Sequence, residues 1–328
     1  MRRPPGRRRQ RGVALIIALI LVALATILAT KITFDGYMER RRSIGMLAIE
    51  QAWQFSLGAE ALAADALSQD LQNSKQDTLA EPWAQRIAPM QITPEDDPEG
   101  EPIGVMDGGL EDMQGRFNLN NLARLTPSNQ PDPQPLEQFE RLLTALDLEP
   151  KWAQLARDWL TAGDVPSVPF GAKDAVYTAQ DPPYRTGNWP MTTPTELMAL
   201  PGFGIDRYRK LAPYVTALPT ATSNINICTA PAVVLESLSS NLTGEYTGNP
   251  DLLANGRKAG CFPDMATFGN TVGPKLLAAI NGRFSDSTSY FRLTTRVTLG
   301  TTEFTLYSLL LRGQGGKVTP ILRSFGTL

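Results

Sequence analysis

Residues 13–30 read VALIIALILVALATILAT and contain no charged side chain. At about 1.5 Å per residue, a helix over this stretch spans roughly 27 Å, close to the hydrocarbon thickness of a bilayer. Six arginines precede it within the first twelve residues, and a basic flank stays on the cytoplasmic side of a membrane. The stretch therefore predicts one membrane-crossing helix, with everything after Lys31 on the opposite side.

The arginine-rich start hides the acidic character of the rest of the chain. The 328 residues carry 31 Lys and Arg against 33 Asp and Glu, a formal charge of −2; without the six leading arginines, 25 basic residues remain against 33 acidic ones. With 42% hydrophobic and 20% charged residues, the chain is long and apolar enough for two domains. This composition excludes global disorder.

Composition also argues against an enzyme. The chain has no histidine and only two cysteines, Cys228 and Cys261, which do not form a CxxC motif. This excludes Ser-His-Asp and Cys-His catalysis and His-ligated metal sites, and it disfavours redox catalysis and structural zinc. Glu111 and Asp112 are adjacent carboxylates, but neighbouring strand residues point to opposite faces and cannot act on one bond. We therefore expect no catalytic activity.

A glycine lies at the junction between the basic segment and the apolar stretch, in Arg11-Gly12-Val13. A cleaved secretory signal or a simple signal anchor also begins with a basic and then an apolar region. However, no small-x-small cleavage pattern follows, and the chain continues with KITF at residues 31–34. Arg-Gly followed at once by an apolar helix resembles the prepilin leader of type IV pilins and type II secretion pseudopilins. The resemblance implies that a prepilin peptidase cuts after Gly12 and leaves Val13 as the new N-terminus.

The fifth residue after the predicted cut is Ile17, where most members of that family carry a glutamate. In the family, this glutamate pairs inside the bilayer with the free amine of the preceding subunit, which offsets the cost of a buried charge. A subunit with isoleucine has no carboxylate to offer a predecessor, so it is suited to be the first subunit of a filament. Absence of the glutamate resembles the type II secretion system protein K family.

Beyond the membrane stretch, apolar residues recur in steps of three and four, which predicts that the helix continues to about Leu71. No proline interrupts the run, although Gly36 and Gly45 weaken it. The helix would then be roughly 55 to 60 residues long, apolar all round in its first half and amphipathic in its second. The predicted sheet-facing stripe consists of Ile44, Ala48, Ala52, Phe55, Ala59, Leu62 and Ala66.

The last third of the chain alternates between apolar and polar residues. This pattern predicts strands over residues 291–299, 304–310 and 317–324, separated by short turns. Three such strands form an antiparallel meander, which can bury one face on the amphipathic part of the N-terminal helix.

The middle of the chain is predicted to be helical, with helices at residues 136–146 and 151–161. Residues 181–219 follow as a run of short helices broken by prolines. The stretch DGGLEDMQGRFNLNNL, residues 107–122, closely resembles a strand-and-turn segment of the protein K family. In that family an all-helical domain is inserted into a pilin-like sheet.

The resemblance implies an α+β, pilin-like fold: a long N-terminal transmembrane helix packed on an antiparallel sheet, plus an inserted all-α domain. The expected division of the chain is a prepilin leader at 1–12, a transmembrane segment at 13–33, the first part of the pilin-like core at 34–121, the inserted helical domain at 122–218 and the second part of the core at 219–328.

Residues 200–205, LPGFGI, with Lys210 nearby, resemble the hairpin of helix-hairpin-helix DNA-binding modules, and residues 223–230 resemble its leading turn. Backbone amides in such a hairpin can hold a phosphate. DNA affinity also needs a concentrated basic surface, whereas the chain without its leader is acidic. A packing hairpin is therefore the favoured interpretation, a membrane-tethered DNA-binding protein is the alternative, and no nucleic acid is expected as a partner.

The two cysteines lie on the non-cytoplasmic side of the predicted membrane helix, where thiols are oxidised. A disulfide between Cys228 and Cys261 is the expected state, and two buried free thiols are the alternative. The disulfide would pin the loop at residues 242–263, which is rich in Gly, Asn and Thr.

Calcium is a candidate structural cofactor, because the family resemblance implies calcium binding in the extracytoplasmic domain. The loop and its end carry oxygen ligands of the kind that calcium prefers. They match no motif of fixed spacing, so solvated loop carboxylates remain an equal alternative. The candidate ligands are Glu245, Asn249, Asp251 and Asp264.

Together these features are similar to those of a minor pseudopilin of the type II secretion system. The resemblance implies a tip complex with the I and J minor pseudopilins, contacts with H and the major pseudopilin, and a role in initiating and capping the periplasmic pseudopilus during protein export. The expected location is the bacterial inner membrane, crossed once, with the C-terminal domain in the periplasm. A type IV pilus minor pilin is the alternative within the class, disfavoured by the inserted domain and by Ile17.

Overall fold

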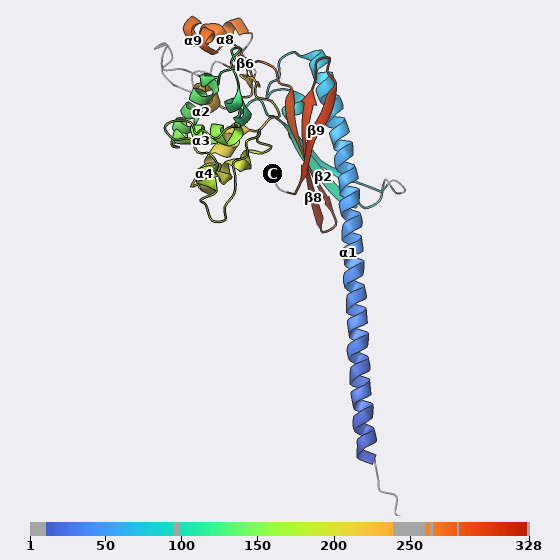
Figure 1. The fold of residues 1–328 in the computed structure, drawn as a ribbon. Coiled ribbons are helices and arrows are strands. Elements are labelled where there is room, and N and C mark those ends of the chain that lie inside the picture. Colours follow the sequence, from blue (N-terminus) through green and yellow to red (C-terminus); the bar gives the residue numbers. More distant parts are fainter. Residues whose placement is uncertain are drawn as a thin grey trace, which may run out of the picture.

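A single long helix, α1 (Arg11–Asn73), dominates the computed structural model, which describes residues 11–94, 97, 99–238, 257, 260–262, 265–280 and 282–326. Its N-terminal half projects away from the rest of the chain as a stalk (Figure 1). The helix is continuous through Gly36 and Gly45, as predicted, and its 63 residues exceed the expected length slightly. At about 1.5 Å per residue it is roughly 95 Å long.

The C-terminal part of α1 packs on a five-stranded antiparallel sheet with the order β1-β2-β7-β8-β9. The predicted C-terminal meander is confirmed, and β2 joins it beside β7 although the two strands are far apart in sequence. Together with the C-terminal part of α1, these strands form what we call the sheet unit. The strands are β1 (Ile87–Ile92), β2 (Gly104–Asp112), β7 (Tyr290–Leu299), β8 (Thr302–Arg312) and β9 (Val318–Phe325).

Alternation of side chains in β7 positions the sheet on α1. Phe291, Leu293, Val297 and Leu299 are buried and contribute to two small apolar clusters with residues of α1. The alternate residues of β7, among them Arg292, Thr294 and Arg296, are polar and less buried, so this strand buries the one face that its alternating pattern predicts.

The buried face of α1 differs from the predicted stripe. The buried residues of its C-terminal half are Ala52, Ser56, Glu60, Ala63 and Leu67. All of these except Ala52 lie one position after a residue of the predicted stripe, so the face of α1 that contacts the sheet is rotated about the helix axis relative to the prediction. The sequence analysis counted apolar residues only, whereas two of the five buried positions are polar. Of the predicted stripe, only Ala52 is buried, and Ile44, Leu62 and Ala66 are exposed.

The helical unit, residues 117–285, lies on the other side of the sheet from α1 (Figure 1). The predicted helices at 136–146 and 151–161 are confirmed as α2 (Pro133–Ala145) and α3 (Lys151–Leu160). The other helices are α4 (Asp174–Tyr177), α5 (Gly204–Leu211), α6 (Ala232–Ser237), α8 (Met265–Val272) and α9 (Pro274–Ile280). Short 3-10 helices are η1 (Pro82–Ala84), η2 (Leu119–Ala123), η3 (Pro194–Ala199) and η4 (Ala212–Tyr214), and two-residue strands are β3 (Phe117–Asn118), β4 (Val215–Thr216), β5 (Ile225–Asn226) and β6 (Phe284–Ser285).

One apolar cluster of buried residues runs through the helical unit from Phe117 to Ile280. This corrects the expected division of the chain, which assigned everything from residue 219 onward to the pilin-like core. Ile225 of β5, Val234 of α6 and Phe268 of α8 pack in the helical cluster, because these short elements bury apolar side chains that the sheet does not cover. The chain returns to the sheet only at β7.

Candidate membrane anchor and assembly surface

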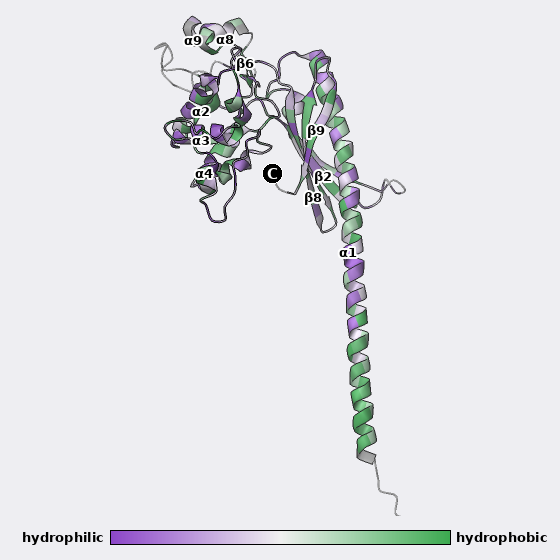
Figure 2. Ribbon diagram, viewed as in Figure 1, coloured by the Kyte–Doolittle hydropathy of each residue, from purple (hydrophilic) through white to green (hydrophobic). Residues whose placement is uncertain are grey.

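The N-terminal half of α1 contacts no other part of the described chain. From Val13 to Thr33 every side chain is exposed, and the most apolar eighteen-residue window has a mean hydropathy of 2.9. Figure 2 shows the membrane end of this half as hydrophobic, with hydrophilic bands following before the helix reaches the sheet. A helix that is apolar all round and unpacked must bury its surface in lipid or against other helices, and it is long enough to span a membrane.

The residues predicted to matter for processing lie at the start of this segment. Gly12 and Val13 are in the first turn of α1, and Ile17 is 52% exposed one turn further on. Because residues 13–30 carry no charge, this helix presents no carboxylate to a neighbouring subunit inside the bilayer. Cleavage after Gly12 stays a prediction.

An apolar groove lies between α1 and the β1 edge of the sheet, and we call it the α1–β1 groove. It encloses about 630 Å³. Leu62 and Ala66 of α1 form one wall, and Met90 of β1 and Met106 of β2 form part of the other. Leu62 is 65% exposed and Met90 is 48% exposed.

The groove explains why part of the predicted stripe of α1 is not buried by the sheet, since Ala59, Leu62 and Ala66 line it. It also lies beside β1, an edge strand whose outer backbone groups have no strand partner among the described residues. Open apolar surface beside a free strand edge is typical of a protein-binding site. We therefore regard the groove as the candidate assembly surface of the sheet unit.

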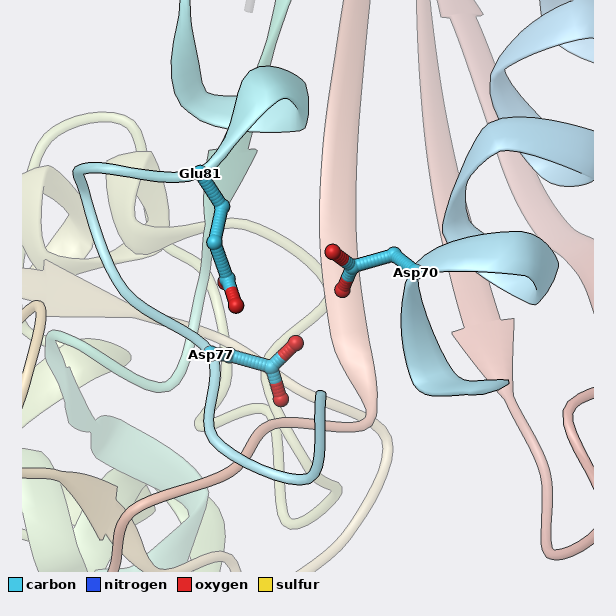
Figure 3. A group of neighbouring side chains, drawn as sticks. All are labelled: Asp70, Asp77 and Glu81. Atoms are coloured by element: carbon cyan, nitrogen blue, oxygen red, sulfur yellow. The ribbon is translucent and has the colours of Figure 1, made fainter. Parts of the chain in front are cut away.

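Three carboxylates converge at the end of α1 (Figure 3). Asp70 comes from its last turns, Asp77 from the following loop and Glu81 from the residue before η1, and their oxygens lie within 4.8 Å of one another. The guanidinium of Arg312 pairs with Asp77 and lies 3.4 Å from Asp70. Glu81 accepts hydrogen bonds from the Thr78 amide (2.8 Å) and the Trp83 indole (2.9 Å). Protein donors thus use these carboxylates, and we interpret the cluster as a helix anchor, not as a metal site.

Arg312 and Asp77 are both almost completely buried, with side chains 2% exposed. Burial raises the pKa of Asp77 to about 6, against the opposing effect of hydrogen bonds from Thr288 and Arg312. Arg312 also donates to the Thr288 carbonyl (2.8 Å). The pair therefore ties the end of α1 to the end of β8.

A second ion pair holds the middle of this half of α1. Glu60 accepts hydrogen bonds from Arg323 of β9 (2.7 and 2.9 Å) and from the hydroxyl of Ser308 of β8 (2.6 Å). Burial alone would raise the pKa of Glu60, but these hydrogen bonds outweigh it and hold the pKa below its ordinary value. The two pairs fix the rotation of α1 on the sheet, and with it the exposure of the groove.

The sequence analysis missed both pairs. A signal was present in β8, where Leu306, Ser308, Leu310 and Arg312 occupy alternating positions on one face. A serine and an arginine on an inward-facing row indicate polar partners on whatever packs there.

The sheet unit meets the helical unit through buried hydrogen bonds around Asp112, the last residue of β2. Its carboxylate accepts from Asn226 (2.8 Å), from the Thr229 hydroxyl (2.5 Å) and from the Gln114 amide (2.7 Å). Burial raises the pKa of Asp112, with these hydrogen bonds acting in the opposite direction. Its neighbour Glu111 points to the other face and pairs with Arg292, so the two carboxylates do not converge, as predicted.

The structure joins Cys228 and Cys261 in the predicted disulfide, inside the core of the helical unit. Arg257 donates to the carbonyls of Cys228 (2.9 Å) and Ala230 (2.8 Å), which adds a polar tie beside the disulfide. The four candidate calcium ligands, Glu245, Asn249, Asp251 and Asp264, lie outside the described residues.

The predicted hairpin at residues 200–205 packs inside the helical unit. Leu200 and Phe203 are 1% exposed, and Phe203 contacts the Trp152 ring edge-on at 5.2 Å. Arg207 of α5 donates to the Phe203 carbonyl (3.0 Å) and pairs with Glu149 (3.1 Å). Hydrogen bonds from Trp152 and Arg207 lower the pKa of Glu149 to about 2. The hairpin therefore has the packing role that the sequence analysis favoured.

Comparison with known proteins gives a consistent result. Residues 115–220 match the family model of the type II secretion system protein K. The chain is 32% identical to the type II secretion system protein K of Pseudomonas aeruginosa, over 98% of this chain and 94% of that protein. It is 30% identical to the protein K of Aeromonas hydrophila, over 98% of this chain and 99% of that protein.

The fold is similar to a chain in the crystal structure of the GspK-GspI-GspJ complex from the type 2 secretion system of enterotoxigenic Escherichia coli. The TM-score is 0.74 at 27% identity, and the match covers 88% of this chain and 100% of that chain. The α+β fold with a long N-terminal helix is thereby confirmed, and the relationship decides against a type IV pilus minor pilin. The chain belongs to the type II secretion system protein K family.

Proposed function

We propose that this minor pseudopilin forms the tip complex of the pseudopilus with the I and J minor pseudopilins of its own secretion system, and that it initiates and caps the filament. The solved complex of GspK with GspI and GspJ supports the choice of partners, because its matched chain shares this fold over its full length. The role is structural, with no catalytic step assigned to this chain.

The observation that carries this proposal is the uncharged membrane half of α1 with Ile17 at the fifth position after the predicted cut. A subunit that joins an existing filament gains from bringing a carboxylate to the preceding N-terminal amine, because a buried amine without a partner is costly. This chain brings none, yet its own N-terminus at Val13 can accept the carboxylate of a following subunit. It is therefore built to precede other subunits and not to follow one.

Co-purification from membranes tests this function. The full chain, expressed with its I and J partners, should carry both through purification in mild detergent. In the α1–β1 groove, Leu62→Asp should lower recovery of at least one partner more than tenfold, because a charged side chain in an apolar contact loses its hydration. The matched control is Leu125→Asp on the helical unit, which is 53% exposed and should leave recovery unchanged. Failure of the unaltered chain to retain either partner would contradict the tip role, and full recovery with Leu62→Asp would assign the contact to another face.

We further propose that the prepilin peptidase cuts after Gly12, that Val13 becomes the N-terminus, and that the folded units lie in the periplasm. The basic residues before Gly12 and the apolar stretch after it support this orientation. Mass spectrometry of the membrane form should find a chain that begins at Val13, with or without an N-methyl group. A chain that begins at Met1, or beyond Thr30, would contradict the proposal.

Calcium remains a proposal for the loop that carries Glu245, Asn249, Asp251 and Asp264, whose oxygens are suitable ligands. Chelation should then lower the thermal stability of the helical unit, and added calcium should restore it. An unchanged melting temperature in the presence of a chelator would contradict calcium binding.

A further inference from the structure

A second basic segment lies on α1 just beyond its apolar half. Arg40, Arg41 and Arg42 are consecutive and all exposed. Consecutive helical residues are about 100° apart, so three of them span about 200°, a little more than half of the helix circumference. We call these three residues the arginine collar. Asp35 and Glu39 lie in the same stretch, yet among the described residues none of the three guanidinium groups forms an ion pair.

The collar lies at the height of a lipid headgroup layer. The apolar sequence extends to Phe34, interrupted only by Lys31, whose long side chain can reach the interface. Arg40 follows Phe34 by six residues, or about 9 Å along the helix axis. The headgroup region adds roughly 5–8 Å on each side of the hydrocarbon core. The backbone of the collar is therefore at the outer border of the headgroups.

The direction of the arginine side chains brings their charges closer to the membrane. Side chains on a helix lean toward its N-terminus, and in α1 the N-terminus is the membrane end. Arg41 shows this directly, because its guanidinium lies over the ring of Tyr37, 5.3 Å from the centroid and one turn nearer to the apolar half. Tyrosine is itself enriched at membrane interfaces. The Arg41 guanidinium thus lies on the membrane side of its own backbone, and the helical lean of side chains favours the same direction for Arg40 and Arg42.

The rest of the molecule leaves this segment free for lipid. The first residue of α1 that is buried against the sheet is Ala52, more than two turns beyond the collar. From these observations we infer that Arg40, Arg41 and Arg42, together with Tyr37, bind the phosphate groups of anionic phospholipids in the leaflet on the side of the folded units. The ligand is the lipid headgroup, and the collar acts as a second, electrostatic anchor beside the apolar helix.

This inference does not depend on the tip role, because it requires only that the apolar half of α1 spans a bilayer. Each basic residue near an anionic surface strengthens association about fivefold, so three arginines together account for a factor on the order of one hundred. High salt should remove most of this gain, because exposed charges are screened.

The test uses the full chain in bilayer discs, with a nitroxide attached to Ser43→Cys. Ser43 is exposed beside the collar, and the two native cysteines are joined in a disulfide, so only the introduced thiol reacts. Discs of phosphatidylcholine are compared with discs that also contain phosphatidylglycerol. We expect the anionic lipid to slow the label, high salt to reverse the effect, and inorganic phosphate in phosphatidylcholine discs to have no effect.

The triple variant Arg40→Gln, Arg41→Gln, Arg42→Gln should lose the response to phosphatidylglycerol. The matched control removes three exposed basic residues of the helical unit, Arg185→Gln, Arg209→Gln and Lys210→Gln, and should keep it. An equal response in both triple variants would overturn the inference. It would also be overturned if the label slowed only after the I and J partners were added, irrespective of lipid, because the collar would then contact acidic protein residues.

Discussion

The helical unit and the sheet unit are held together in different ways. Among the residues that the structure describes, the helical unit has one continuous apolar cluster of 32 buried residues, whereas α1 and the sheet share two clusters of seven and four. The α1–sheet contact instead includes two ion pairs with buried carboxylates, Arg312–Asp77 and Arg323–Glu60. A helix that must also present apolar surface to lipid and to other subunits can give little of it to its own sheet. The ion pairs therefore determine how α1 is rotated about its axis and how it is aligned along the sheet.

The largest expected effect comes from breaking the deeper ion pair. Asp77→Ala leaves the buried guanidinium of Arg312 without its main partner, and arginine cannot shed its charge. Loss of one member of a buried pair costs about 3–5 kcal/mol. Urea unfolding of the full chain in detergent should show this loss in the sheet unit. The double variant Asp77→Ala, Arg312→Met should be less destabilised than the single one, and an equal or larger loss would contradict the anchoring role of the pair.

Removal of the disulfide should affect the other unit. Cys228 and Cys261 are 33 residues apart, and a cross-link over such a loop contributes roughly 3 to 4 kcal/mol. Cys228→Ala with Cys261→Ala should therefore raise hydrogen exchange in α2, α3 and α6 while β7 and β8 keep their protection. Equal loss of protection in the strands would show that the two units unfold together, and would contradict their separate stabilisation.

A smaller effect is a difference in pH dependence between the two ion pairs. The pKa of Asp77 is raised to about 6. Its contribution to stability is therefore fully present at pH values below the ordinary pKa of an aspartate, and it is lost as the pH rises through about 6. The pKa of Glu60 is lowered. Its contribution to stability is therefore fully present at pH values above the ordinary pKa of a glutamate, and it is lost as the pH falls through the pKa of the folded state. Asp77→Asn should remove the change in stability between about pH 4 and 6. Glu60→Gln should remove the change in stability at more acidic pH. Melting temperatures across this range check both, and the same pH profile in the two variants would contradict the assignment.

Local periodicity predicted much of the fold. The continuity of α1, the helices α2 and α3 and the meander from β7 to β9 each depend on residues close in sequence, where apolar spacing is a direct signal. Contacts between distant segments place β2 beside β7 and pack Ile225, Val234 and Phe268 with the helical unit. Such contacts leave no periodic pattern. The uncharged stretch at residues 13–30 predicted the membrane helix, and the resemblance to a family supplied the assembly role, whereas the groove and the ion pairs required the structure.

The uninterrupted course of α1 has a mechanical consequence. From Val13 to Ile44 every side chain of α1 is exposed, and Ala48 already packs against the apolar cluster at the sheet. The exposed part contains no proline, and the helix continues through Gly36 and Gly45. A displacement applied to its membrane end therefore travels along one rod to the two ion pairs and on to the helical unit. A filament that grows beneath this subunit would push on the folded units through this helix, and the helix is least stable at those two glycines.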